Sequence, residues 1–122
     1  MASVPTQRTL KELRERGWAY QVLEKFQRFA GGGGFKKDCW GADIIALDGL
    51  PGSLLIQTTS DTNHAARRTK VLAIPEVKLW LDAGNRFHVW TWGKRVSAGR
   101  GSRKVWTLRE EEITLEQLRA AS

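Results

Sequence analysis

Two short apolar segments joined by a turn constrain this chain more than any other feature. The first, at 42–47, reads Ala-Asp-Ile-Ile-Ala-Leu, and the second, at 53–58, reads Ser-Leu-Leu-Ile-Gln-Thr. The sequence Asp-Gly-Leu-Pro-Gly at 48–52 lies between them and is typical of a turn, because glycine and proline favour the backbone angles that turns need. The two segments are therefore predicted to be the neighbouring strands of a hairpin.

A single acid interrupts the first of these strands. Asp43 stands among aliphatic residues, where an ionised carboxylate is costly to desolvate and usually has a cation or a metal as its partner. On the second strand, Gln57 stands where a second carboxylate would complete a metal site. The other interpretation is that Asp43 caps a turn or pairs with an arginine, and that the polar run at 57–60 is only a strand end leading into a helix.

The rest of the chain alternates between helical and strand patterns. Apolar spacing, capping residues and glycine stops predict, in order, a helix at 9–16, strands at 18–29, 42–47 and 53–58, helices at 62–72 and 76–83, strands at 86–92 and 104–109, and a short helix after a capping box at 114–117. Residues 24–27 would also tolerate a helix, and the glycine run at 31–34 is expected to form a hairpin tip or a loop. The order predicts a mixed α/β fold.

Length and charge narrow the function classes. The 122 residues are expected to form one domain, with a core at about 9–92, a basic loop at 93–103 and a strand and helix at 104–122. No apolar run approaches the ~20 residues of a membrane span, and the N-terminus lacks an apolar signal segment. One cysteine cannot form an internal disulfide, so we expect a cytoplasmic protein without membrane contact. The net charge of +7 favours a polyanionic partner.

The order of these elements resembles the core of the PD-(D/E)XK nuclease superfamily. The chain is most similar there to the Holliday junction resolvase-like nucleases and the virus-type replication-repair nuclease domains, over about residues 9–92. Three segments carry the resemblance: the glycine-then-Asp strand at 41–47, the strand motif at 55–60 and the start of the following helix at 63–68. It implies a restriction-endonuclease-like α-β-β-β-α-β core of a mixed sheet flanked by helices, with an extra C-terminal strand and short helix.

The resemblance also implies a metal-dependent endonuclease that hydrolyses phosphodiester bonds in DNA, with branched or structured DNA as the substrate and a homodimer as the working unit. Mg²⁺, or Mn²⁺ in its place, would be held by Asp43, by Gln57 at the acid position and by the carbonyl of Thr58. Thr59 stands where the family has its lysine. The amide of Gln57 can bind Mg²⁺ through its oxygen but adds no charge, so weaker metal binding is expected.

Other residues are candidates to replace what the motif lacks. Lys70 on the following helix, or Lys36 and Lys37 before Asp43, are candidates for the missing cation. Glu24 or Asp38 is a candidate for the second carboxylate. On a regular strand Asp38 and Asp43 would point to opposite faces, and a bulge at Gly41 would change that.

Basic residues are the candidates for contacts with DNA. They are Lys36, Lys37, Arg67, Arg68, Arg95, Arg100 and Arg103. Lysine and arginine of this kind bind phosphates without reading sequence, although a solvated basic face without a partner would look the same. Of the six tryptophans, Trp40 is the one expected to be most exposed for base stacking, with core packing as its other interpretation.

Two alternative functions stay open. The first is a catalytically degenerate nuclease fold that binds DNA or a protein partner, which the residues at 57 and 59 favour. The second is a nucleic-acid-binding module of another α/β fold, in which Asp43 is structural. Convergence of Asp43, Gln57 and Glu24 in space would argue against this second alternative.

Overall fold

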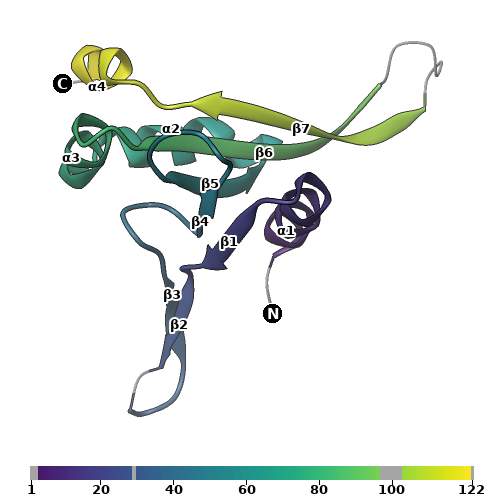
Figure 1. The fold of residues 1–122 in the computed structure, drawn as a ribbon. Coiled ribbons are helices and arrows are strands. Elements are labelled where there is room, and N and C mark those ends of the chain that lie inside the picture. Colours follow the sequence, from purple (N-terminus) through teal and green to yellow (C-terminus); the bar gives the residue numbers. More distant parts are fainter. Residues whose placement is uncertain (1–2, 29, 97–102, 122) are drawn as a thin grey trace.

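The computed structural model describes residues 3–28, 30–96 and 103–121 and folds them into one α/β domain (Figure 1). The elements, in order, are α1 (Val4–Arg16), β1 (Ala19–Val22), β2 (Lys25–Arg28), β3 (Gly34–Lys37), β4 (Ile44–Leu47), β5 (Leu54–Ser60), the 3₁₀ turn η1 (Asp61–Asn63), α2 (His64–Leu72), α3 (Pro75–Asp82), β6 (Arg86–Val96), β7 (Lys104–Glu112) and α4 (Leu115–Ala121). The predicted α/β class, with an additional C-terminal strand and helix, is confirmed.

Five strands form the main sheet, in the order β1-β4-β5-β6-β7. The pairs β1–β4, β4–β5 and β6–β7 are antiparallel, whereas β5 and β6 run parallel. Parallel neighbours need a crossover connection, and η1, α2 and α3 supply it here. The predicted hairpin of 42–47 and 53–58 is present as β4 and β5.

The prediction of one continuous strand at 18–29 was wrong. The segment divides into β1, in the main sheet, and β2, which pairs with β3 in a separate hairpin. The break falls at Leu23 and Glu24, whose backbone N–H groups both donate to the carbonyl oxygen of Asp43, at 2.7 and 3.2 Å. The β2–β3 hairpin then leaves the body of the molecule, with the glycine run at its turn (Figure 1).

The predicted basic loop at 93–103 was also wrong in part. Residues 93–96 continue β6 and pair with 104–107 of β7, so the two strands form a ribbon that extends beyond the rest of the sheet (Figure 1). Strand periodicity is hard to see there because glycine, lysine and arginine replace the alternating apolar residues. Residues 97–102, which include Arg100, lie outside the described residues.

Helix α1 begins five residues earlier than predicted. The hydroxyl of Ser3 accepts the backbone N–H of Thr6 at 3.3 Å, which caps the helix. Pro5 fits the first turn because it has no N–H to leave unpaired. The predicted stop is confirmed, since Gly17 adopts a left-handed φ of 75°.

Helices cover both faces of the sheet. On one face, α1 packs through Leu13 against Ile44, Ile56 and Trp90. On the other face, α2 and α3 contribute the buried residues Val71 and Val77 and lie over Leu55, Phe87 and Val89. These two apolar layers hold the strands, and with them the polar ends of β4 and β5, in fixed positions. Among the described helices, none is long and apolar enough to cross a membrane.

Candidate active site

A polar cavity of about 260 Å³ lies where β4 begins and β5 ends. Its lining residues come from α1, from both ends of the β2–β3 hairpin, from β4, β5 and α2: Ser3, Thr6, Glu24, Asp38, Asp43, Gln57, Thr58, Arg67 and Lys70. The cavity therefore brings together all four candidate catalytic residues, Asp43, Gln57, Glu24 and Lys70. The three candidate metal ligands, Asp43, Gln57 and Thr58, also line it.

Asp43 is the centre of the hydrogen-bond network in this cavity. Its Oδ2 atom accepts hydrogen bonds from Nε2 of Gln57 at 2.7 Å, from the backbone N–H of Thr58 at 3.0 Å and from the Thr58 hydroxyl at 3.1 Å. The side chain is almost fully buried. Its backbone N–H donates to Ile56 at 2.9 Å, which ties the residue to β5.

The surroundings of Asp43 raise its pKa to about 6. Burial is the main cause, because it removes water from the charged form, and the negative charges of Glu24 and Asp38 add to it. The hydrogen bonds from Thr58 act in the opposite direction and limit the shift. The negative charges of Glu24 and Asp38 therefore act on Asp43 across this cavity.

Gln57 has an unmatched hydrogen-bonding atom. The residue is 3% exposed, and its Nε2 atom donates to Asp43 and to the Thr58 carbonyl oxygen. Its Oε1 atom is buried without a hydrogen-bond partner in the described part of the chain. Leaving a buried acceptor unpaired costs about 1–3 kcal/mol. An amide oxygen in this state is a ready ligand for a hard cation.

Asp38 reaches the same cavity as Asp43 because the chain turns between them. Cys39 and Ala42 exchange backbone hydrogen bonds, Trp40 and Gly41 adopt left-handed φ values of 52° and 83°, and Asp38 Oδ1 accepts the N–H of Gly41 at 3.3 Å. Asp38 and Asp43 therefore do not point to opposite faces, as they would on a regular strand. The chain departs from a strand here through a tight turn that includes Gly41. Lys70 lies 3.4 Å from Asp38 Oδ2, so a cation is present beside the carboxylates.

Helix α1 also contributes to the site, which the sequence pattern did not predict. The Thr6 hydroxyl lies 2.9 Å from that of Thr58 and 2.9 Å from that of Ser3, so a chain of hydroxyl groups leads to Asp43. Thr6 is 2% exposed, which positions its hydroxyl firmly. The polar residues of the first helical turn gave the only available signal, and the helix was predicted to begin after them.

The candidate DNA-binding residues are scattered. Arg67 lines the cavity, whereas Nε of Arg68 pairs with Glu111 at 3.0 Å and Arg95 pairs with Asp61. Lys37 and Arg103 are exposed on the two projecting hairpins. Arg100 and the side chain of Lys36 lie outside what the structure describes. Thr59, at the lysine position of the resembled motif, is buried.

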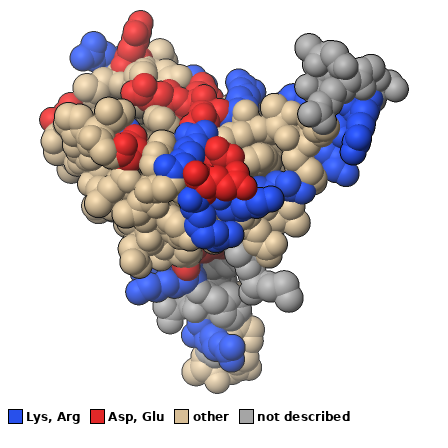
Figure 2. All heavy atoms as spheres, turned by 45° about the vertical axis from the view of Figure 1, so that its right-hand side comes forward, with Lys and Arg blue, Asp and Glu red and all other residues tan. Residues whose placement is uncertain are grey.

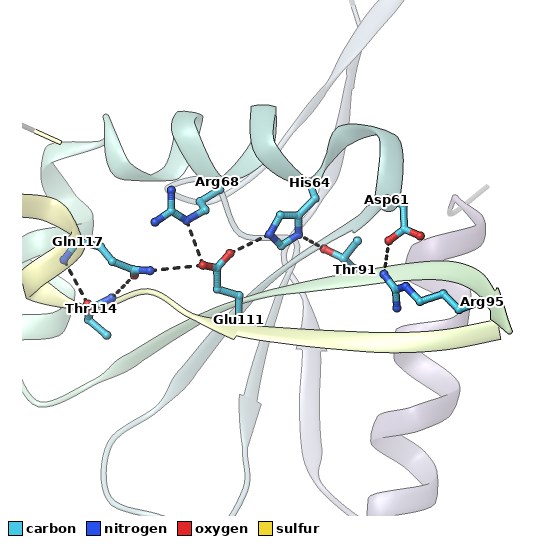
Figure 3. Close-up of polar contacts among 8 residues, drawn as sticks. All are labelled: Asp61, His64, Arg68, Thr91, Arg95, Glu111, Thr114 and Gln117. Atoms are coloured by element: carbon cyan, nitrogen blue, oxygen red, sulfur yellow. Dashed lines mark hydrogen bonds and ion pairs between the residues drawn. The ribbon is translucent and has the colours of Figure 1, made fainter. Parts of the chain in front are cut away.

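A second polar network lies between α2 and the strands β6 and β7 (Figure 3). His64 contacts the Thr91 hydroxyl through Nδ1 and Glu111 through Nε2 at 2.8 Å, while Arg68 and Gln117 also contact Glu111. Burial tends to raise the pKa of Glu111, but the hydrogen bond with His64 and the charge of Arg68 together bring it below its ordinary value. Thr91 is fully buried and cannot reach a substrate, so this network connects elements of the fold.

Positive charge lines both projecting hairpins (Figure 2). On the β6–β7 ribbon, the partly exposed ring of Trp106 contacts two cations: Arg8 of α1 lies 3.9 Å from the ring centre and Lys94 lies at 5.3 Å. Such cation–aromatic stacks expose groups that bind both phosphates and bases. The ribbon therefore carries both cationic and aromatic groups near its surface.

The donor set suits a hard cation that keeps some of its water. Within the described residues, no three His, Cys, Asp or Glu side chains gather closely enough to hold a metal ion by themselves. Asp43 and the unpaired oxygen of Gln57 nevertheless offer oxygen ligands, and Mg²⁺ commonly binds through one or two carboxylates plus water. Comparisons of the chain with protein-family models, curated proteins and solved structures gave no match.

Proposed function

We propose that this protein is a metal-dependent endonuclease of the PD-(D/E)XK type that hydrolyses phosphodiester bonds in branched or structured DNA. The observation that carries the proposal is the convergence of Asp43, Gln57 and Glu24 on one cavity, with Lys70 and Arg67 beside them. Dispersal of these residues would have removed the basis for it. The α-β-β-β-α-β order of α1, β1, β4, β5, α2 and β6 supports the same resemblance, with β2–β3 as an insertion.

Under this proposal, different residues of the cavity would bind the metal ion, supply a cation and hold the phosphate. Asp43 and the Oε1 atom of Gln57 would hold Mg²⁺ or Mn²⁺, with the Thr58 carbonyl as a further oxygen. A bound divalent cation would polarise the phosphoryl oxygen and activate water. Lys70 can replace the lysine that Thr59 does not supply, because its side chain already reaches the carboxylate of Asp38. Arg67 would hold a neighbouring phosphate oxygen.

The basic hairpins fit a DNA substrate larger than the cavity. The net charge is +7, Lys94 and Lys104 lie on the β6–β7 ribbon, and Arg103 directly precedes β7. Phosphate contacts of this kind position a duplex without reading its sequence. The proposal includes a cytoplasmic homodimer, because the resolvases that this chain resembles work as two-fold dimers that cut symmetrically. Light scattering on the purified protein would test whether it is a dimer.

A second function is supported by one particular contact. The Gln57 Nε2 atom donates to Asp43 Oδ2 at 2.7 Å, so an amide N–H occupies part of the space around the carboxylate that a cation would need. The three donors around Asp43 stabilise it without a metal. This arrangement favours a catalytically degenerate fold that binds DNA, or a protein partner, without cutting it.

Cleavage assays distinguish the two functions. Labelled four-way junction, duplex and single-stranded DNA would be incubated with Mg²⁺, Mn²⁺ or EDTA, beside the variant Asp43→Asn. Metal-dependent cutting that disappears in the variant would establish the nuclease and its site. Tight binding of DNA with no cutting under any of these conditions would establish the degenerate fold instead.

A further inference from the structure

A larger cavity adjoins the candidate active site at the base of the β2–β3 hairpin. Its volume is about 550 Å³, and Leu23, Lys25, Lys37, Asp38, Cys39 and Trp40 line it. Asp38 lines both cavities, so they are neighbours. A group bound in the larger cavity would therefore lie next to any phosphodiester bond placed in the smaller one.

Two lysines in this cavity oppose each other across the hairpin, and Asp38 is the one carboxylate among the residues that line the cavity. Lys25 and Lys37 are directly paired across β2 and β3, so their side chains leave the same face of the hairpin. Like charges in this register destabilise a strand pair. Both side chains are exposed, and an anion placed between them would remove the repulsion. A phosphate group meets that requirement.

Trp40 is the aromatic residue that lines the same cavity, and both its backbone angle and its exposure are unfavourable for a tryptophan. Its φ of 52° is left-handed, a region that bulky residues rarely enter, and it is the one non-glycine residue with a positive φ in the described chain. The side chain is 44% exposed and contacts Trp80 at a ring distance of 6.2 Å. A large ring held in a strained and exposed position is typical of a binding site.

We propose that this cavity binds one unpaired nucleotide of the DNA substrate, with its base stacked on Trp40 and its phosphate between Lys25 and Lys37. A base within a duplex has both faces covered by its neighbours, so Trp40 can stack only on a base that is unpaired or at an end. The inference rests on the proposed function and deepens it. The preferred substrate is DNA with an unpaired nucleotide beside the bond that is cut.

Binding measured without a metal tests the inference separately from catalysis. The fluorescence anisotropy of a labelled duplex with a short central bulge, and of the same duplex without one, would be followed in EDTA. The native protein is expected to prefer the bulged DNA. Trp40→Ala should lower that affinity about ten-fold while leaving duplex binding unchanged, since stacking on one aromatic ring is worth about 1–3 kcal/mol. Trp40→Phe keeps an aromatic ring and should retain most of the preference.

Three further variants complete the test, one of them as a control. Lys25→Gln combined with Lys37→Gln should weaken the preference for bulged DNA and make the hairpin more stable, because it removes the repulsion between paired cations. Leu50→Ala changes another exposed apolar residue, in the turn between β4 and β5, and should change neither property. Trp40→Gly relieves the left-handed strain, so it should lose the preference without a fall in melting temperature.

Cys39 allows the same cavity to be examined in the unaltered protein. It is the sole cysteine and is partly exposed. Bulged DNA should slow its modification by a thiol reagent more than duplex DNA does. Equal affinity for bulged and plain duplex, or an equal loss of both in Trp40→Ala, would overturn the inference. Because no step requires cleavage, failure of the nuclease proposal would show instead as intact binding preference without cutting in Mg²⁺.

Discussion

The amide nitrogen of Gln57 lies 2.7 Å from Oδ2 of Asp43, while the amide oxygen of the same side chain is buried without a hydrogen-bond partner in the described part of the chain. One end of this amide therefore stabilises the carboxylate, and the other end has no hydrogen-bond donor among the described residues. The geometry lets a neutral residue stand at an acid position without leaving Asp43 unpaired. Under the proposed function, Gln57 is therefore the residue whose replacement best separates metal-dependent cleavage from binding alone.

Replacing Gln57 by glutamate should strengthen metal binding. In Gln57→Glu the added charge would raise the affinity for Mg²⁺ by roughly ten-fold, which corresponds to ~1.4 kcal/mol. In EDTA the variant should melt at a lower temperature than the native protein, because two adjacent carboxylates repel each other. Melting curves recorded with and without Mg²⁺ would measure both effects. An equal melting temperature in the two conditions would contradict a cation site at Gln57.

Removing the charge of Asp43 should stabilise the fold and abolish cleavage. The raised pKa of about 6 means that the folded protein holds a proton on Asp43 more tightly than the unfolded chain, whose value is near 3.8. The native protein therefore loses stability as the pH rises from about 4 through about 6. At pH 8 and without metal, Asp43→Asn should be about 2–3 kcal/mol more stable, and near pH 3 the two should be equal. Urea unfolding at both pH values would check this.

Glu111 should matter for stability rather than for activity. Glu111→Ala removes the partner of both His64 and Arg68, so α2 loses its polar connection to β7 (Figure 3). We expect a loss of about 1–3 kcal/mol in the free energy of unfolding. The neighbouring exposed residue Glu112 gives a matched control, since Glu112→Gln should cost much less. If Glu111→Ala keeps full stability and loses cleavage, the network has a catalytic role.

The β6–β7 ribbon should contribute affinity that depends on salt. Neutralising Lys94, Arg103 and Lys104 together with glutamine should weaken binding to all DNA sequences alike. The slope of log affinity against log salt concentration should fall by about one for each phosphate contact that is lost. Lys78→Gln on α3, whose lysine pairs with Asp82 within the same helix, is the control. An unchanged salt slope in the triple variant would exclude the ribbon from the DNA contact.

Most of the fold could be predicted from the sequence, because the local patterns of apolar, capping and turn residues match the elements that form. The apolar hairpin of β4 and β5, the left-handed stop at Gly17 and the capping box of α4 were all visible in the sequence, and the capping box is present as reciprocal hydrogen bonds between Thr114 and Gln117. The break between β1 and β2 could not be predicted. It depends on backbone hydrogen bonds to Asp43, which is distant in sequence.

The central residues of the candidate site could be predicted from the sequence, whereas the residues around them could not. Asp43 and Gln57 could be recognised because each is a polar residue within an apolar strand. The hydroxyl of Thr6 contacts Thr58 across a separation of 52 residues, and no local pattern reports such a contact. The turn that brings Asp38 beside Asp43 requires a left-handed tryptophan, which residue preferences argue against.

The insertion of the β2–β3 hairpin has a geometric consequence. Glu24 directly precedes its first strand and Asp38 directly follows its second, so the stem of the hairpin is also the rim of the cavity. Because Lys25 pairs directly with Lys37, the register of this hairpin determines how far apart the two carboxylates next to them can lie. A one-residue shift in that register would therefore change the charge around Asp43 without replacing any residue of the cavity itself.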